Sequence, residues 1–298
     1  MRFFVLLAAA ILVPSVALAQ PDKKASPSNC TELVKSFGLI DLTADSTIAD
    51  RPDGCVFSNV FAGFGAYNRV RLGEVTLKSP TLFADLAADS LPSALELTIS
   101  GFQLAPETGS ALNNYIIEVQ STPLDIHFAY VWDKAARTVE LTDFSVTAPQ
   151  YGAYRVSARA SDVMLDPEQL DDPENIPGAL DALSIDIENA RFLSSMLVPP
   201  LLGSLPSDDD PRPLIETYKT AATAFITGLP SAKISDDTKS ALTEFVAAFP
   251  RPTGDYTLAI AADPGLKFTA LLVDNPIQLA ALLAGLELTA THTPLKQP

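Results

Sequence analysis

The sequence contains few of the side chains that carry out acid–base and metal chemistry. Its 298 residues include two histidines, two cysteines and one tryptophan. Neither His127 nor His292 has HExxH spacing, and the chain lacks GxSxG, GxxxxGK[ST] and GxGxxG motifs. Zinc hydrolases, serine hydrolases and nucleotide-binding enzymes are therefore unsupported. We expect a protein that is not an enzyme, with no catalytic residue, no metal and no cofactor.

Basic residues are also scarce. The chain has 20 Lys and Arg against 36 Asp and Glu, which gives a formal net charge of −16. Proteins that bind nucleic acid need Lys and Arg to contact phosphates, so we expect no nucleic acid partner. The same deficit argues against electrostatic attachment to anionic lipid.

Long apolar runs are missing beyond the N-terminus, so we expect no transmembrane span. The chain opens with MRFFVLLAAAILVPSVALAQ, in which Arg2 precedes a short apolar run and Ala19 ends a small-x-small cleavage site. This pattern is typical of a secretory signal peptide over residues 1–19. Gln20 rather than Cys follows the cut, which disfavours a lipid-anchored lipoprotein. We expect a periplasmic protein in which residues 20–28 form a flexible leader.

The two cysteines, Cys30 and Cys55, suit one disulfide bond in an exported protein. A redox role is disfavoured because CxxC spacing is absent. Asn29, with Glu32 three residues later, resembles a capping box and predicts a short helix that begins near Cys30 and ends before Gly38. The bond would tie this helix to the first strand.

Alternation of apolar and polar residues dominates from about Val56 to Ile187. One apolar and one polar face is typical of an antiparallel sheet that is covered on a single side. The segments with this alternation contain Leu95, Leu97 and Ile99; Tyr115, Ile117 and Val119; Leu124 to Trp132; and Leu183, Ile185 and Ile187.

The stretch TVELTDFSVTAPQYGAYRVSARASDV (138–163) predicts two strands joined by a turn at 149–152. The apolar phase changes between Leu141 and Phe144, which requires an extra residue near Thr142-Asp143, a β-bulge. A similar slip occurs at Gly73. Repeated bulges bend a sheet, so we expect it to be curved.

Helical spacing replaces alternation after about residue 191. The pattern predicts a helix that ends near Gly228, a second that starts at Ser235 and stops before Pro250, and a third that starts at Pro276. Strand periodicity returns around Leu258, in Phe268 to Leu272 as the other half of a hairpin, and in Leu286 to Ala290.

These patterns indicate an α+β fold with a large curved antiparallel β-sheet that contains bulges and is covered by helices mainly from the C-terminal third. We expect a single elongated domain over residues 29–298, rich in strands over 56–190 and rich in helix over 191–298.

Carboxylates leave two alternatives open. The acidic, proline-rich stretches 166–174 and 208–210 are typical of solvated loops, and calcium binding there is less favoured because EF-hand spacing is absent. A glycosidase carboxylate pair is set by spatial position and leaves no sequence signature. Sugar sites usually contain several aromatic side chains, however, and Trp132 is the only tryptophan.

The stretch YVWDKAARTVELTDFSVTAPQYGAYRVSARASDV resembles the β-layers of uncharacterised proteobacterial periplasmic proteins similar to the AsmA type. The likeness extends over about Val131 to Pro264, and includes the segment TEFVAAFPRPTGDYTLAIAADP. The resemblance implies an envelope location, an extended antiparallel sheet and no established catalytic residues. The chain lacks the transmembrane anchor of true AsmA-type proteins, which puts a bridging role between membranes in doubt.

The leading hypothesis is a non-enzymatic periplasmic protein that binds an apolar, lipid-like ligand or an envelope protein along its sheet. The alternatives are an assembly factor with an exposed sheet edge and, less favoured, a hydrolase of an envelope polymer. The residues expected on the ligand face are Phe128, Tyr130, Trp132, Leu141, Phe144, Val146, Tyr154 and Val156. The same apolar positions are more typical of ordinary hydrophobic core than of a ligand site.

Overall fold

A computed structural model describes residues 26–38, 40–63, 69–149, 151–164, 177–192, 194, 198, 202, 210–231, 234–271 and 276–295. The predicted signal peptide, most of the leader and the two acidic loops, apart from Asp210, lie outside these residues. The chain forms two compact units. The first unit contains residues 2–149 and 161–178, and the second contains residues 150–160 and 179–298. Both units contain antiparallel strands, as the fold class predicted.

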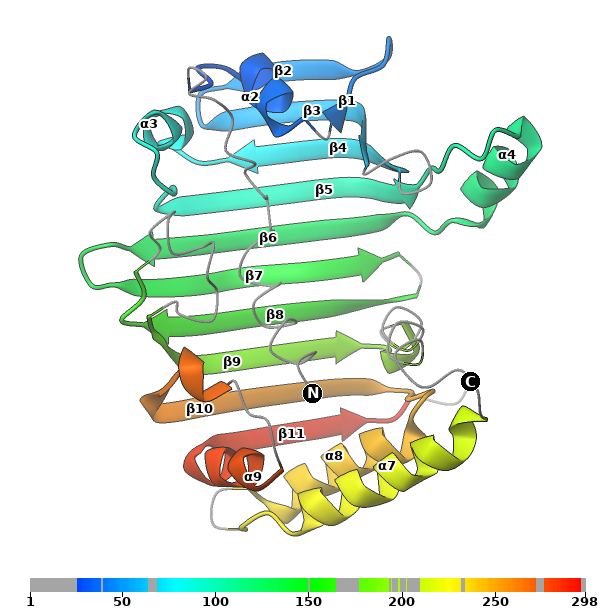
Figure 1. The fold of residues 1–298 in the computed structure, drawn as a ribbon, viewed down its shortest axis with the longest axis vertical. Coiled ribbons are helices and arrows are strands. Elements are labelled where there is room, and N and C mark those ends of the chain that lie inside the picture. The colour runs from blue at the N-terminus through cyan, green and yellow to red at the C-terminus, as the bar shows by residue number, and fades with distance from the viewer. Residues whose placement is uncertain are drawn as a thin grey trace. The chain divides into compact units, whose positions relative to one another are not determined.

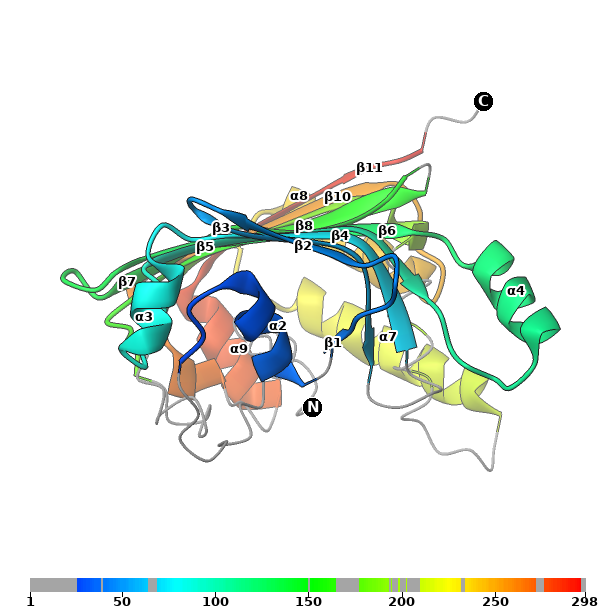
Figure 2. The ribbon, with the colours of Figure 1, turned by 90° about the horizontal axis from the view of Figure 1, so that it is seen from above.

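The first unit is a sheet of strands in the order β1-β3-β4-β5-β6-β7, with β2 also paired to β3 (Figure 1). Its helices are short, and α2 and α3 lie on the same side of the strands (Figure 2). The elements are α2 (Cys30–Phe37), β1 (Ile40–Asp41), β2 (Thr47–Arg51), β3 (Gly54–Gly63), β4 (Arg69–Lys78), α3 (Leu82–Ala87), β5 (Ala94–Leu104), α4 (Ala111–Gln120), β6 (Leu124–Asp133) and β7 (Thr138–Ala148).

One hydrophobic core of the first unit lies between the helices α2 and α3 and the strands β3 and β4. The α2 helix starts as predicted, because the Asn29 side chain accepts a hydrogen bond from the Glu32 N–H at 2.9 Å. It ends before Gly38, whose φ of 63° is left-handed. Leu33 and Val34 are buried against this part of the sheet, so the N-terminal helix covers it.

The predicted bulge in β7 is confirmed. Ala129 of β6 pairs with Asp143, while the next residue, Tyr130, pairs with Leu141, so Thr142 is the extra residue. The Thr142 hydroxyl donates to the Ala129 carbonyl at 3.1 Å. Phe144 therefore returns to the face that Leu141 occupies.

The expected slip at Gly73 takes a different form. Leu72 and Val75, three residues apart, both reach the core, so the side-chain phase does change at Gly73. However, the pairing of β4 with β3 and with β5 keeps the same register on both sides of this point. The neighbouring strands change phase at the same level, at Asn59 (φ 51°) and Gly101 (φ 67°). The prediction of a bulge at Gly73 was thus wrong, because β3, β4 and β5 all change their side-chain phase at the same level and no extra residue is needed.

One predicted strand was also wrong. Tyr115, Ile117 and Val119 lie in helix α4 rather than in a strand. The local reason is the cap at Ser110, whose hydroxyl accepts a hydrogen bond from the Asn113 N–H at 3.4 Å. The segment fits helical spacing as well as alternation, and the cap favours the helix.

The second unit contains strands in the order β8-β9-β10-β11 and several helices. Its elements are β8 (Gly152–Ser161), β9 (Ala179–Glu188), α7 (Pro211–Thr227), α8 (Asp236–Ala248), β10 (Asp255–Lys267), the 3-10 helix η3 (Phe268–Leu271), α9 (Pro276–Gly285) and β11 (Glu287–Thr293). The three predicted α-helices and the last strand are confirmed. The hairpin was wrong, since β10 is one long strand between β9 and β11, and η3 follows it.

Helix α8 packs on β11, the last strand of the second unit. Ile234 and Leu288 are buried in the core between them. The Ala290 N–H of β11 donates to the Thr238 hydroxyl of α8 at 3.2 Å, and Thr238 itself is buried. A backbone donor on the outer side of β11 is therefore satisfied by a helix, which protects this edge from pairing with another chain.

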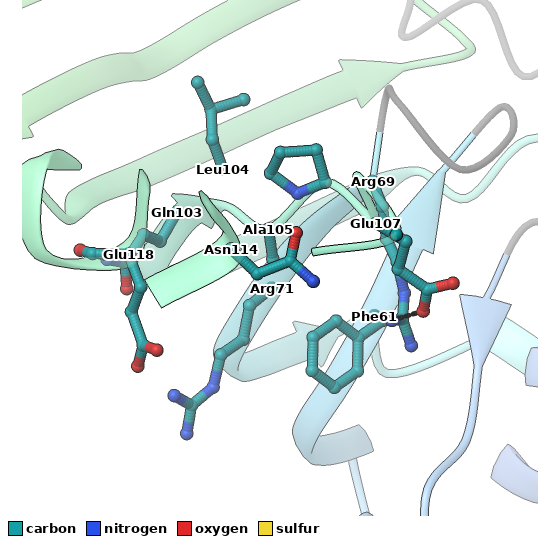
Figure 3. Close-up of a pocket in the computed structure, with 11 residues that line it drawn as sticks. Phe61, Arg69, Arg71, Gln103, Leu104, Ala105, Glu107, Asn114 and Glu118 are labelled. Atoms are coloured by element: carbon teal, nitrogen blue, oxygen red, sulfur yellow. Dashed lines mark hydrogen bonds and ion pairs between the residues drawn. The ribbon is translucent and has the colours of Figure 1, made fainter. Parts of the chain in front are cut away.

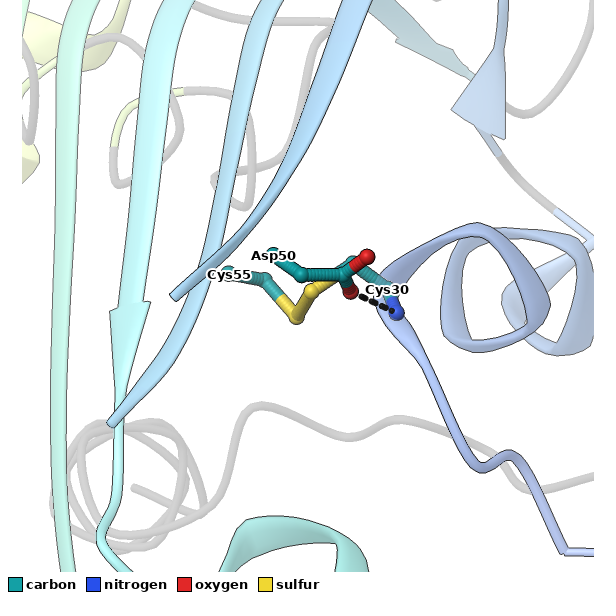
Figure 4. A group of neighbouring side chains, drawn as sticks. All are labelled: Cys30, Asp50 and Cys55. Atoms are coloured by element: carbon teal, nitrogen blue, oxygen red, sulfur yellow. Dashed lines mark hydrogen bonds between the residues drawn. A yellow bond between two sulfur atoms is a disulfide. The ribbon is translucent and has the colours of Figure 1, made fainter. Parts of the chain in front are cut away.

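The disulfide between Cys30 and Cys55 is confirmed, with a Cα–Cα distance of 5.6 Å. Asp50 of β2 lies beside it and accepts a hydrogen bond from the Cys30 N–H at 2.9 Å (Figure 4). These three side chains are grouped as metal ligands would be, but both sulfurs are bonded to each other and neither is a free thiolate. Within the described residues, no helix has the length and apolar character to cross a membrane.

Candidate binding cleft

The predicted ligand face is one face of β6 and β7. Direct cross-strand partners share a face in an antiparallel pair, and here Phe128 is opposite Phe144 and Tyr130 is opposite Leu141. The register thus places six of the eight predicted residues on one face of the first unit: Phe128, Tyr130, Trp132, Leu141, Phe144 and Val146. The other two, Tyr154 and Val156, lie in β8 of the second unit.

Much of this face is buried. Phe128, Leu141, Val146 and Val156 are all buried side chains, while the remaining four are half-buried. The Tyr130 hydroxyl donates to the Pro92 carbonyl at 2.9 Å. Burial raises the pKa of Tyr130 to about 12, and the charge of Asp85 adds to the effect. Whether these eight side chains contact a ligand stays a prediction.

The opposite, polar face of the first unit carries a row of interacting side chains. His127 lies between two carboxylates, with Nδ1 2.8 Å from Asp143 and Nε2 3.8 Å from Glu96. Lys78 donates to Glu96 at 2.9 Å, and this hydrogen bond is the main reason that the pKa of Glu96 is lowered. Ser145 donates to Asp143 at 3.4 Å rather than to the histidine. Among the described residues, the partners of the imidazole in this row are carboxylates rather than hydroxyls.

His292, the second histidine, is held in the second unit. Its ring stacks on Tyr256 at 4.2 Å, and its Nδ1 lies 2.6 Å from Glu244. Its Nε2 lies 3.0 Å from the Thr253 carbonyl. Both ring nitrogens are therefore occupied by contacts within the protein, which ties α8 to β11.

A cleft of about 500 Å³ lies on the first unit where β3, β4 and β5 approach α4 (Figure 3). Phe61, Arg71 and Gln103 are direct cross-strand partners and form one row on the same face. The loop after β5 and the polar side of α4 complete the lining. The lining residues are Phe61, Arg69, Arg71, Gln103, Leu104, Ala105, Pro106, Glu107, Gly109, Asn114 and Glu118.

The two arginines of the cleft differ in their partners. The Arg69 guanidinium lies 4.0 Å above the Phe61 ring and forms an ion pair with Glu107. Arg71 donates to the Asn59 side-chain oxygen at 3.2 Å. Among the described residues, no carboxylate forms an ion pair with Arg71. Its guanidinium therefore keeps hydrogen-bond donors open to the cleft.

The wall of the cleft is held in place by side-chain amides. Gln103 donates to the Glu118 carbonyl at 2.7 Å, which ties α4 to β5. The Asn114 side-chain oxygen accepts hydrogen bonds from the Thr108 N–H at 3.0 Å and from its hydroxyl at 2.7 Å. These bonds connect α4 to the preceding loop.

Reasoning from the sequence did not find this cleft. Arg69 and Arg71, two residues apart in a predicted strand, are a signal that could have drawn attention to this face of the sheet. The contribution of Gln103 and of α4 left no such signal, because it depends on strand register and on the path of the loop. Comparison with known proteins assigns no family to the chain, since no protein-family model and no curated protein matches it.

Proposed function

We propose that the protein is a non-enzymatic periplasmic binding protein and that the cleft beside α4 receives a partly apolar, anionic ligand. The proposal keeps the non-enzymatic, exported role that the sequence predicts and moves the binding surface from the apolar sheet face to the cleft. The observation that carries it is Arg71, whose guanidinium lines the cleft with an amide oxygen as its one hydrogen-bond partner among the described residues.

The chemistry of the lining supports this class of ligand. A guanidinium presents a planar set of donors that matches a carboxylate or a phosphate. Leu104, Ala105 and Pro106 supply apolar contact surface beside it. Charge-assisted hydrogen bonds contribute about 1.5–3 kcal/mol, less at an exposed site such as this one. Together with partial burial of an alkyl chain, we expect a dissociation constant of about 10 µM to 1 mM.

Calorimetric titration with octanoate tests the proposal, and octyl glucoside serves as the uncharged probe, both below their micelle concentrations. Octanoate should bind the wild type and bind at least tenfold more weakly to Arg71→Gln, which loses the charge. Lys78→Gln is the matched control, because Lys78 lies on the same strand and pairs with Glu96. Equal octanoate affinity in the wild type and Arg71→Gln would exclude the cleft as the site.

Native mass spectrometry of protein from its natural host separates the cleft from the sheet face. A hydrophobic anion that co-purifies with the wild type and is lost from Arg71→Gln supports the cleft. Retention of the same ligand in Arg71→Gln would return the site to the apolar face of β6 and β7.

The periplasmic location and the resemblance to AsmA-type β-layer proteins remain predictions. Sequencing the N-terminus of the exported protein tests the location, and the expected first residue is Gln20. The assembly-factor alternative has less support, because β2 is five residues long and contains Asp50 and Arg51, and because α8 packs on β11. Short, charged or covered edges do not favour pairing with another strand.

A further inference from the structure

Helix α4 presents its apolar side to solvent. Four apolar residues at helical spacing form one stripe along α4, namely Leu112, Tyr115, Ile116 and Val119. Their exposed fractions are 67%, 64%, 41% and 66%, and no residue of the helix is buried. A surface helix normally packs such a stripe against its own protein, so this orientation is the reverse of the usual one.

The polar side of α4 is the side that faces the first unit. Asn114 bonds to Thr108, and the Glu118 carbonyl accepts from Gln103. Asn114 and Glu118 also line the cleft, and the helix stands beyond the ends of β5 and β6 (Figure 1, Figure 2). Because the helix is held from its polar side, the stripe is left for something outside this unit.

The shape and area of the stripe argue against two kinds of binding partner, a small apolar molecule and a second copy of the chain. A small apolar molecule needs a concave site, and the outer side of a single helix is convex. A dimer held together by this stripe would bury too little surface to be stable. The exposed parts of the four side chains amount to roughly 300–400 Å², whereas a stable dimer buries about 800 Å² on each partner. Two copies with a net charge of −16 would also repel each other.

We propose that α4 docks the protein on the surface of a lipid bilayer composed of zwitterionic lipids. An amphipathic helix can lie in the plane of the interface with its apolar side among the acyl chains. Tyr115 suits this position, because tyrosine is enriched at the boundary between membrane and water. Glu118 is the only charged residue in α4, so the contact depends on apolar area rather than on anionic headgroups.

The strength of docking is limited by the size of the stripe. Four partly exposed side chains bury less apolar surface than one myristoyl chain, which binds bilayers with a constant of about 10⁴ M⁻¹. We therefore expect reversible association with a constant of at most about 10⁴ M⁻¹. The net charge of −16 weakens it further on anionic vesicles at low salt.

Flotation with phosphatidylcholine vesicles tests the proposal on the chain from Gln20 onward, so that the apolar N-terminal segment does not contribute. The wild type should float with the vesicles, and Leu112→Ser with Val119→Ser should bind at least tenfold more weakly. Both side chains are exposed, so folding should be unaffected, which far-ultraviolet circular dichroism checks. Val131→Ser is the matched control, since Val131 is an apolar side chain that is 50% exposed on β6.

A second measurement reports on α4 directly. In a Trp132→Phe background, Tyr115→Trp gives a single tryptophan on the stripe, and its emission should shift to the blue when vesicles are added. Absence of wild-type flotation, or flotation unchanged by the double substitution, would overturn the proposal. Sedimentation that reveals a dimer dependent on the stripe would assign it to a second copy instead. Arg71→Gln should float like the wild type, which keeps this test independent of the cleft.

Discussion

Replacing Cys30 and Cys55 together by alanine should destabilise the first unit and leave the second unchanged. The bond joins positions 25 residues apart, so the chain-entropy model assigns it about 3.5 kcal/mol. Alanine is the appropriate replacement, because the two side chains are 0% and 1% exposed and a serine hydroxyl would be buried there. Loss of the two sulfurs from a packed core adds to the effect, which gives an expected total of about 3–5 kcal/mol.

The single tryptophan makes the measurement specific. Trp132 lies in the first unit, as the disulfide does, so its fluorescence during urea unfolding reports on that unit. The wild type in dithiothreitol and the double variant should lose similar amounts of unfolding free energy. The reductant should have no effect on the variant, which contains no cysteine.

A loss below about 1 kcal/mol would contradict the reasoning. In that case the packing of Leu33 and Val34 would hold α2 on the sheet without the covalent bond, and the unfolded chain would be little restricted by it. A large effect of dithiothreitol on the double variant would show that the reductant acts elsewhere.

Three further perturbations test the packing and the buried polar groups. Tyr130 has its pKa raised from 10.0 to about 12, so its neutral form stabilises the fold fully below pH 10 and this contribution is lost as the pH rises to about 12. Ultraviolet titration should reveal a late tyrosine that is missing in Tyr130→Phe; an identical titration of both proteins would contradict the assignment. Gly73→Ala should cost about 1–3 kcal/mol by urea unfolding, because its Cβ would lie 2.9 Å from the Ser100 carbonyl oxygen. Unchanged stability would show that the strands can separate there. Thr238→Val should cost about 1–3 kcal/mol and speed hydrogen exchange at the Ala290 amide, whereas Thr238→Ser keeps the acceptor and should exchange slowly. Slow exchange in the valine variant would mean that another acceptor replaces the hydroxyl.

Elements with a strong local signal were predictable. The bulge at Thr142 followed from the sequence because Val139, Leu141, Phe144 and Val146 cannot all reach one face without an extra residue. The start of α8 followed from Ser235, whose hydroxyl accepts from the Thr238 N–H at 3.2 Å. In each case the deciding sequence pattern lies within a few residues along the chain.

Elements with an ambiguous local signal could not be predicted from the sequence. Residues 111–120 satisfy both a strand and a helix pattern, and residues 268–271 form a 3-10 helix where alternation suggested a strand. At Gly73 the phase change was visible in the sequence. However, a bulge in one strand and a phase change shared by three strands produce the same apolar pattern within a single strand. Only the neighbours Asn59 and Gly101 distinguish them.

Local sequence patterns were thus enough to indicate the antiparallel strands, the bulge in β7 and the caps of the longer helices, and the cysteine count was enough to indicate the disulfide. The cleft and the outward stripe of α4 required the folded molecule. Arg71 meets Phe61 and Gln103 only because of pairings with strands that lie about 10 and 30 residues away along the chain. The outward direction of the stripe depends on the polar bonds that hold the other side of the helix. Which side chains face one another across strands is settled by register, and register is a property of the whole sheet.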